Sequence, residues 1–97
     1  MCAIAGIIGE KNEHITSMIN AQIHRGPDDS GTKWLNGCKV GLGHTRLSVI
    51  DLTAAAHQPF IIADLNLAIV FNGEIYNYLE LRKQLIQKGH KFCSDSD

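Results

Sequence analysis

Cys2, directly after the initiator methionine, is the residue best placed to do chemistry. A residue this small in second place permits removal of the methionine, which leaves a free α-amino group on the cysteine. The ordinary pKa values of an α-amino group and a thiol differ by less than about one unit, so the amine can accept the thiol proton as the sulfur attacks. Taken alone, however, an early cysteine is more typical of a small apolar residue that begins a strand.

Two other segments have the composition of turns or loops: the Asn72-Gly73 pair and the loop HRGPDDSG at 24–31. An asparagine amide donates hydrogen bonds, and glycine lets the backbone approach a substrate closely. The same pair also suits a simple turn between a strand and a helix. In isolation, the loop is compatible with phosphate or metal binding, but we favour a structural role in which His24 and Arg25 hydrogen-bond near the site.

Composition argues against several other classes of function. A formal net charge of −1 gives no reason to expect nucleic acid or a membrane surface as a partner. The three cysteines form no CxxC pair and the five histidines lack ligand spacing, so neither a disulfide framework nor a metal site is expected. No apolar run approaches the about 20 residues that span a bilayer, and the first residues do not resemble a signal peptide. Cytoplasm is therefore the expected location.

Hydrophobic spacing predicts the elements that would hold these residues. The apolar run at 2–9 is typical of a buried strand, and isoleucines and Met18 at helical spacing predict a helix over roughly 13–24. Asn12 is available as its cap, and Gly26-Pro27 as its stop.

The remaining chain is expected to form strands and a second helix. Asn36-Gly37 predicts a hairpin turn, and Asn77 and Gly89 are expected to bound the helix. Further strands are expected over 46–52, 60–64, 67–72 and, in extended form, 91–97. This order predicts an α+β protein with mainly antiparallel sheets. Its uncovered strand edges suggest half of a layered domain.

Five motifs in sequence order give the chain a family resemblance. MCAIAG, HRGPDDSG, LGHTRLSVIDL, HQP and FNGEIYNYLELRKQL together resemble the class II glutamine amidotransferases, which are N-terminal nucleophile hydrolases, and most of all their asparagine synthetase type. Ala3 stands where that family usually has glycine. The resemblance implies that 1–97 is the N-terminal part of the glutaminase domain, a truncated portion of an αββα sandwich of mainly antiparallel sheets.

The same resemblance implies roles for individual residues. Cys2 would attack the side-chain amide of glutamine and form a thioester, while the amide of Asn72 and the N–H of Gly73 would stabilise the oxyanion. Arg46 would hold the α-carboxylate of glutamine, and Asp97 its α-ammonium group. The complete set of implied substrate contacts is Arg46, Val49, Asn72, Gly73, Glu74 and Asp97. For Val49 a plain core position is nearly as good an interpretation, and for Arg46 the alternative is an exposed strand arginine.

The implied function is hydrolysis of glutamine to glutamate and ammonia, with ammonia passed to an acceptor, by analogy aspartate. The glutaminase part would need no metal or organic cofactor, whereas ATP and Mg²⁺ would belong to a synthetase domain beyond this chain. The expected partners are glutamine and either that domain or a second chain that completes the fold. A non-catalytic fragment or split subunit is the alternative, and the sequence leaves assembly into a homo-oligomer open.

Overall fold

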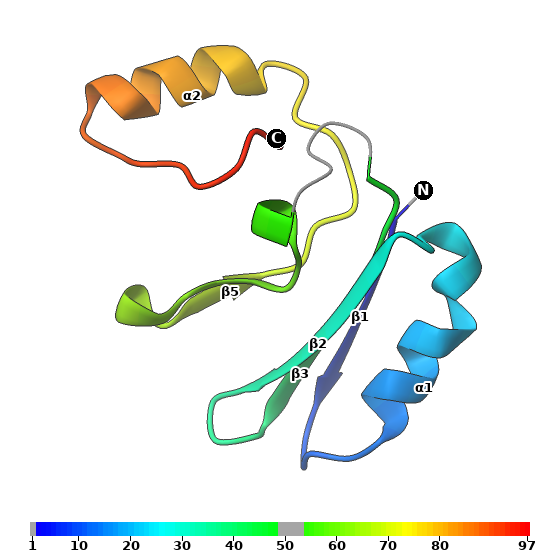
Figure 1. The fold of residues 1–97 in the computed structure, drawn as a ribbon. Helices are drawn as coiled ribbons and strands as arrows, with labels where there is room; N and C mark the ends of the chain where they lie inside the picture. The colour runs from blue at the N-terminus through cyan, green and yellow to red at the C-terminus, as the bar shows by residue number, and fades with distance from the viewer. Residues whose placement is uncertain (1, 49–53) are drawn as a thin grey trace.

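Two antiparallel sheets and two α-helices make up the computed structural model, which describes residues 2–48 and 54–97 (Figure 1). The three-stranded sheet has the order β1-β3-β2, and the two-stranded sheet consists of β4 and β5. This architecture confirms the mixed, mainly antiparallel α+β class. The elements are β1 (Ala3–Ile8), α1 (His14–Ala21), β2 (Asp29–Leu35), β3 (Val40–Arg46), β4 (Phe60–Ile62), β5 (Leu67–Ile69) and α2 (Tyr78–Gln87).

The pairing register of β3 determines what lies beside Cys2. Ala3 at the start of β1 pairs with Thr45, the last pair between these strands. On the other side of β3, Asp29 pairs with Arg46. Extending the β1–β3 register by one residue places Cys2, which directly precedes β1, in one row with Arg46 and Asp29, and opposed residues of antiparallel strands project from the same face.

Helix α1 covers one face of this sheet and forms the core with it (Figure 1). Ile15 and Ile19 are buried against Ala5, and Trp34 packs against the same cluster. Strand β3 has glycine where the helix comes closest, since a Cβ on Gly43 would lie 2.6 Å from the Ile19 side chain. The alternation of β3 therefore leaves its other face, which carries His44 and Arg46, to the rest of the chain.

The predicted first helix is confirmed, with a shorter α-helical part. The N-cap residue is Glu13 and not the predicted Asn12, and it makes no side-chain capping bond. The side chain of Asn12 instead accepts a hydrogen bond from the backbone N–H of His14 at 2.8 Å, in the turn that leads into the helix. The α-helix ends at Ala21, and a 3₁₀ turn over Ile23–Arg25 leads to Gly26. The predicted stop at Gly26-Pro27 thus ends the 3₁₀ turn.

The predicted hairpin is also confirmed, but its first strand begins earlier than expected. Asn36 and Gly37 have φ angles of 52° and 63°, as the turn requires, and Cys38 has 66°. Strand β2 starts at Asp29, so the end of the segment assigned to loop 24–31 is sheet. The chain crosses this part of β2 at Gln58. A Cβ on Gly31 would collide with the Gln58 carbonyl oxygen, so the close crossing requires glycine at this position.

The second half of the chain lies on the opposite side of the sheet from α1 (Figure 1). Helix α2 and the β4–β5 pair occur where the sequence predicts them, although both strands are shorter than expected. The predicted strand over 91–97 is wrong: this tail folds back on α2 without ladder bonds. Arg82 holds it by donating to the Ser94 carbonyl at 2.6 Å and by lying 4.7 Å from the centre of the Phe92 ring.

Two smaller expectations also fail or cannot be placed. The aromatic ring of Tyr76 favours a core position, yet the residue is 91% exposed because it precedes α2 in an irregular segment. Of the predicted strand 46–52, only Arg46 belongs to a strand; Leu47 and Ser48 have no regular structure, and the other positions lie outside the described residues. None of the helices within 2–48 and 54–97 is long and apolar enough to cross a membrane.

Gly26 provides a test of how the HRGPDD segment is built. A Cβ at this position would lie 2.5 Å from the backbone nitrogen of Arg46, so the loop backbone rests directly on the end of β3. We expect Gly26→Ala to lower the free energy of unfolding by about 1–3 kcal/mol, since backbone must shift to relieve the overlap. Urea unfolding of the native-length protein measures this effect.

Gly6→Ala is the matched control for that measurement. A Cβ on Gly6 would meet its nearest atom at 3.7 Å, an ordinary contact. We therefore expect a change within about 0.5 kcal/mol. Equal losses for the two variants would show that the close approach of the loop at Gly26 does not limit stability.

Candidate active site

Cys2 is half-buried at the entry to β1, where the end of β3 turns away. Its sulfur accepts a hydrogen bond from the backbone N–H of Leu47 at 3.4 Å and lies 3.7 Å from the Leu47 carbonyl oxygen. The Cys2 carbonyl accepts a bond from Nε of Arg25 at 3.4 Å. The cysteine is therefore held at both its side chain and its backbone, and the contact from Arg25 agrees with the structural role expected of loop 24–31.

Arg46 lies in the same row as Cys2 and is only 7% exposed. This burial does not fit the alternative of an exposed strand arginine. Its backbone carbonyl accepts a hydrogen bond from Asp28 N–H at 3.0 Å, and the Asp28 carboxylate accepts one from Ser48 N–H at 2.8 Å. The turn after Arg46 is thus tied to the HRGPDD segment that supports it.

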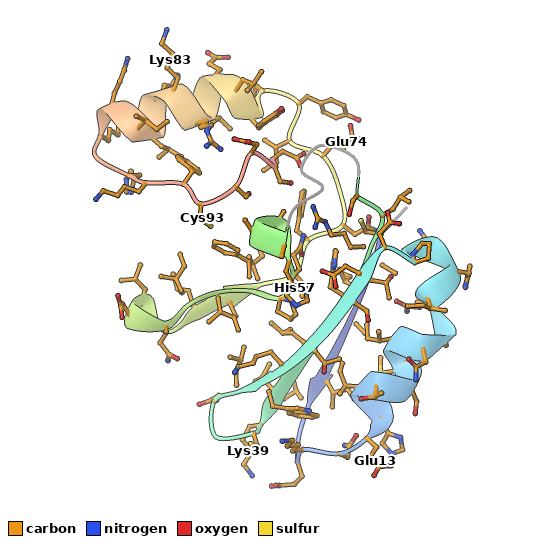
Figure 2. All side chains as sticks on the ribbon, viewed as in Figure 1. Glu13, Lys39, His57, Glu74, Lys83 and Cys93 are labelled. Atoms are coloured by element: carbon orange, nitrogen blue, oxygen red, sulfur yellow. The ribbon has the colours of Figure 1, made fainter. Side chains whose placement is uncertain are left out.

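Asn72, Gly73 and Glu74 follow β5 in a segment without regular structure, and all three are exposed. Figure 2 shows Glu74 on this segment, between β5 and α2. Gly73 lies against the ring of Phe71, where an added Cβ would come within 2.9 Å of the ring. Asparagine and glycine at this point present an amide and a backbone N–H that are accessible to a ligand.

The C-terminal residue reaches the same segment. Oδ2 of Asp97 accepts a hydrogen bond from the backbone N–H of Ile75 at 2.6 Å. The Asp97 carboxylate therefore lies against the backbone just after Glu74, although 23 positions separate the two residues in sequence.

The segment 71–74 is connected to the sheet through Phe71. His44, which is 1% exposed, places Nε2 at 3.2 Å from the Phe71 carbonyl oxygen. The N–H of Phe71 donates to Oε1 of Gln58 at 2.6 Å. Our sequence interpretation gave no role to His44 or Gln58. Their presence in the quoted motifs LGHTRLSVIDL and HQP was the only available signal.

A polar cluster surrounds His44 on this face of the sheet. Burial lowers the pKa of His44; the hydrogen bond to Phe71 opposes that effect, while the positive charge of Arg46 adds to it. The imidazole is therefore neutral near pH 7, with its hydrogen on Nε2, because a carbonyl oxygen can only accept. Beside it, the Asp29 carboxylate lies 2.5 Å from Nδ1 of His57 (Figure 2).

The predicted site residues thus fall into two groups. Cys2 and Arg46 lie at the end of the β1–β3 pair, whereas Asn72, Gly73, Glu74 and Asp97 surround the segment before α2. The His44–Phe71 bond links the groups. Within the described residues, no hydrogen bond joins Asn72 or Gly73 to the Cys2 sulfur, and Val49 lies outside those residues.

Comparison with protein families gives a match over the whole chain. The family model described as the glutamine amidotransferase domain matches residues 1–97. No solved structure matches the chain significantly.

Curated relatives are similar over most or all of the chain. Glutamine-hydrolysing asparagine synthetase 1 of Bacillus subtilis (strain 168) is 40% identical over 105 residues, covering 100% of this chain and 16% of that protein. A putative glutamine-hydrolysing asparagine synthetase 2 of Methanocaldococcus jannaschii is 42% identical, covering 87% and 20%. Amidase chry2 of Gibberella zeae is 39% identical, covering 88% and 12%. The chain spans a fifth or less of the length of these relatives.

Proposed function

This chain belongs to the glutamine amidotransferase domain family, and from that membership we propose that it is the N-terminal part of a glutaminase domain that hydrolyses glutamine through Cys2. One observation carries the proposal: Cys2 stands at the start of β1 with its sulfur held by Leu47 N–H, level with the buried Arg46. A nucleophile and a cation for a substrate carboxylate are thereby fixed on one strand pair.

The proposed reaction uses the α-amine of Cys2 as the base, once Met1 is removed. The sulfur attacks the carboxamide carbon of glutamine while the amine takes the thiol proton. The oxyanion accepts hydrogen bonds from the Asn72 amide and the Gly73 N–H. The amine then passes its proton to the departing nitrogen, the C–N bond breaks, and ammonia leaves a glutamyl thioester. Water, deprotonated by the same amine, attacks the thioester and releases glutamate and the thiol.

Substrate recognition in this proposal depends on charge complementarity. The Arg46 guanidinium suits a carboxylate because it presents paired donors in a plane. Glu74 and Asp97 supply negative charge for the α-ammonium group, and the bond from Ile75 N–H, which holds Asp97 at the segment that carries Glu74, supports this assignment. Val49 would add backbone contacts.

The proposal extends to the protein beyond this chain. Because the chain spans 16% of its Bacillus subtilis relative, we propose that further sequence completes an αββα sandwich. A synthetase domain or second chain using ATP and Mg²⁺ would receive the ammonia, with aspartate as the acceptor and the cytoplasm as the location. No cofactor is assigned to the glutaminase part.

The second candidate is a non-catalytic fragment or split subunit. The exposed apolar residues of the β4–β5 pair favour it, since unpaired edges and apolar faces are suited to another chain. The largest exposed fractions there are those of Leu65, Leu67 and Ile69, at 64%, 57% and 55%.

A glutaminase assay distinguishes the two candidates. We expect the native-length protein, shown by intact mass to lack Met1, to release glutamate and ammonia from glutamine in equal amounts without added metal. Coupled detection of both products checks the stoichiometry. Glutamate formation no faster than in buffer would favour the non-catalytic candidate.

A further inference from the structure

We propose that His44 and Gln58 form a clamp on the backbone of Phe71 that positions the oxyanion donors Asn72 and Gly73. The inference rests on the proposed glutaminase function and adds two positioning residues to it. Neither residue contacts the substrate in this proposal; both act through the peptide groups on either side of the Phe71 Cα.

The first residue of the clamp is His44. Its Nε2–H donates to the Phe71 carbonyl at 3.2 Å. That carbonyl shares a rigid peptide plane with the Asn72 N–H, so the bond fixes the direction in which the chain enters Asn72. His44 is itself immobile, because it is buried in the central strand and paired with Ile4 on one side and Gly31 on the other.

The second residue of the clamp is Gln58. Its Oε1 accepts the Phe71 N–H at 2.6 Å, which fixes the preceding peptide plane. The backbone of Gln58 is held against β2, because Gly31 has no Cβ to keep it away. Two peptide planes joined at one Cα are therefore both anchored to the three-stranded sheet, and this leaves little freedom in the φ and ψ angles of Phe71.

The side chain of Phe71 extends this constraint to Gly73. Its ring occupies the space that a Cβ on Gly73 would need. Asn72 and Gly73 belong to no helix or strand, and both are exposed. Their orientation therefore depends on the anchored Phe71, since no ladder of backbone hydrogen bonds runs through them.

The clamp also sets the donors relative to the nucleophile. His44 and Ile4 are register partners, and Cys2 and Arg46 stand two residues further along the same strand pair. The β1–β3 pair therefore has the Cys2 sulfur at its end and, two residues further in, His44, which bonds to the donor segment at Phe71. Catalytic groups must be held within about 0.5 Å of their productive positions. A clamp anchored to the strand pair that also carries Cys2 would hold Asn72 and Gly73 in place relative to the sulfur.

The kinetic test uses the native-length protein. We expect His44→Leu and Gln58→Met each to lower kcat for glutamate release by about 10- to 100-fold, as a misplacement of about 1 Å does, with KM changed less than about 3-fold. His44→Gln should recover most of the loss, because its amide nitrogen can donate from a similar position. His90→Leu and Gln87→Met, which replace exposed residues, should leave kcat unchanged.

A second measurement does not depend on activity. Hydrogen–deuterium exchange at the Phe71 amide should accelerate at least about 10-fold in Gln58→Met, while amides of β1 remain protected. Unchanged exchange at Phe71, or unchanged kcat in folded variants of an active enzyme, would overturn the clamp alone. A wild-type protein inactive on glutamine would overturn the proposed function, and with it the catalytic role of the clamp.

Discussion

Replacing Cys2 with alanine is expected to reduce glutamate release from glutamine to the rate in buffer. Loss of a covalent nucleophile lowers kcat by a factor on the order of 10⁶ in a well-measured hydrolase. Alanine keeps the α-amine, so the variant removes the proposed nucleophile and leaves the proposed base in place. The half-buried Cys2 side chain makes two hydrogen bonds among the described residues, both with the backbone of Leu47, and the fold should therefore survive. A discontinuous glutamate assay over hours measures the residual rate.

Cys93→Ala is the matched control for this variant. Cys93 is also a free cysteine, and it is exposed on the tail beneath α2 (Figure 2). We expect its removal to leave glutamate release within about 2-fold of wild type, because Cys93 is not one of the residues of the candidate site. If Cys2→Ala retained a substantial rate with an unchanged unfolding midpoint, the sulfur of Cys2 would not be the nucleophile.

The sequence predicted correctly those elements whose structure depends on residues close to one another in the chain. Isoleucines at helical spacing predicted the face of α1 that buries Ile15 and Ile19, and Asn36-Gly37 predicted the hairpin. The tail 91–97 was predicted as a strand and failed, because its conformation depends on Arg82 of another element. Likewise, β2 extends back to Asp29 because β3 supplies partners there, which composition alone does not reveal.

The candidate site shows the same division between local and long-range information. The positions of Cys2 and Asn72-Gly73 in motifs made them candidates without a structure. The pairing of Asp97 with Ile75 and the clamp on Phe71 join segments at least 13 residues apart. Such contacts depend on sheet register and on where the chain crosses β2. Neither can be obtained from the spacing of residue types.

Replacing Asn72 with alanine tests the oxyanion donors directly. Removal of one donor lowers kcat by about 10²- to 10³-fold in hydrolases that depend on such a group, and we expect a loss of this size. KM for glutamine should change little, because the oxyanion exists only at the tetrahedral stage. Steady-state kinetics with the native-length protein separates the two parameters.

The exposed position of Asn72 makes this variant easy to interpret. Its side chain forms no hydrogen bond within the described residues, so the loss of rate should not be accompanied by a loss of stability. Asn77→Ala is the matched control: Asn77 is an exposed asparagine before α2 whose side chain makes no capping bond. A higher KM with unchanged kcat in Asn72→Ala would instead assign Asn72 to ground-state binding. The Gly73 N–H would then remain as the oxyanion donor, and the clamp on Phe71 would have to act through Gly73 alone.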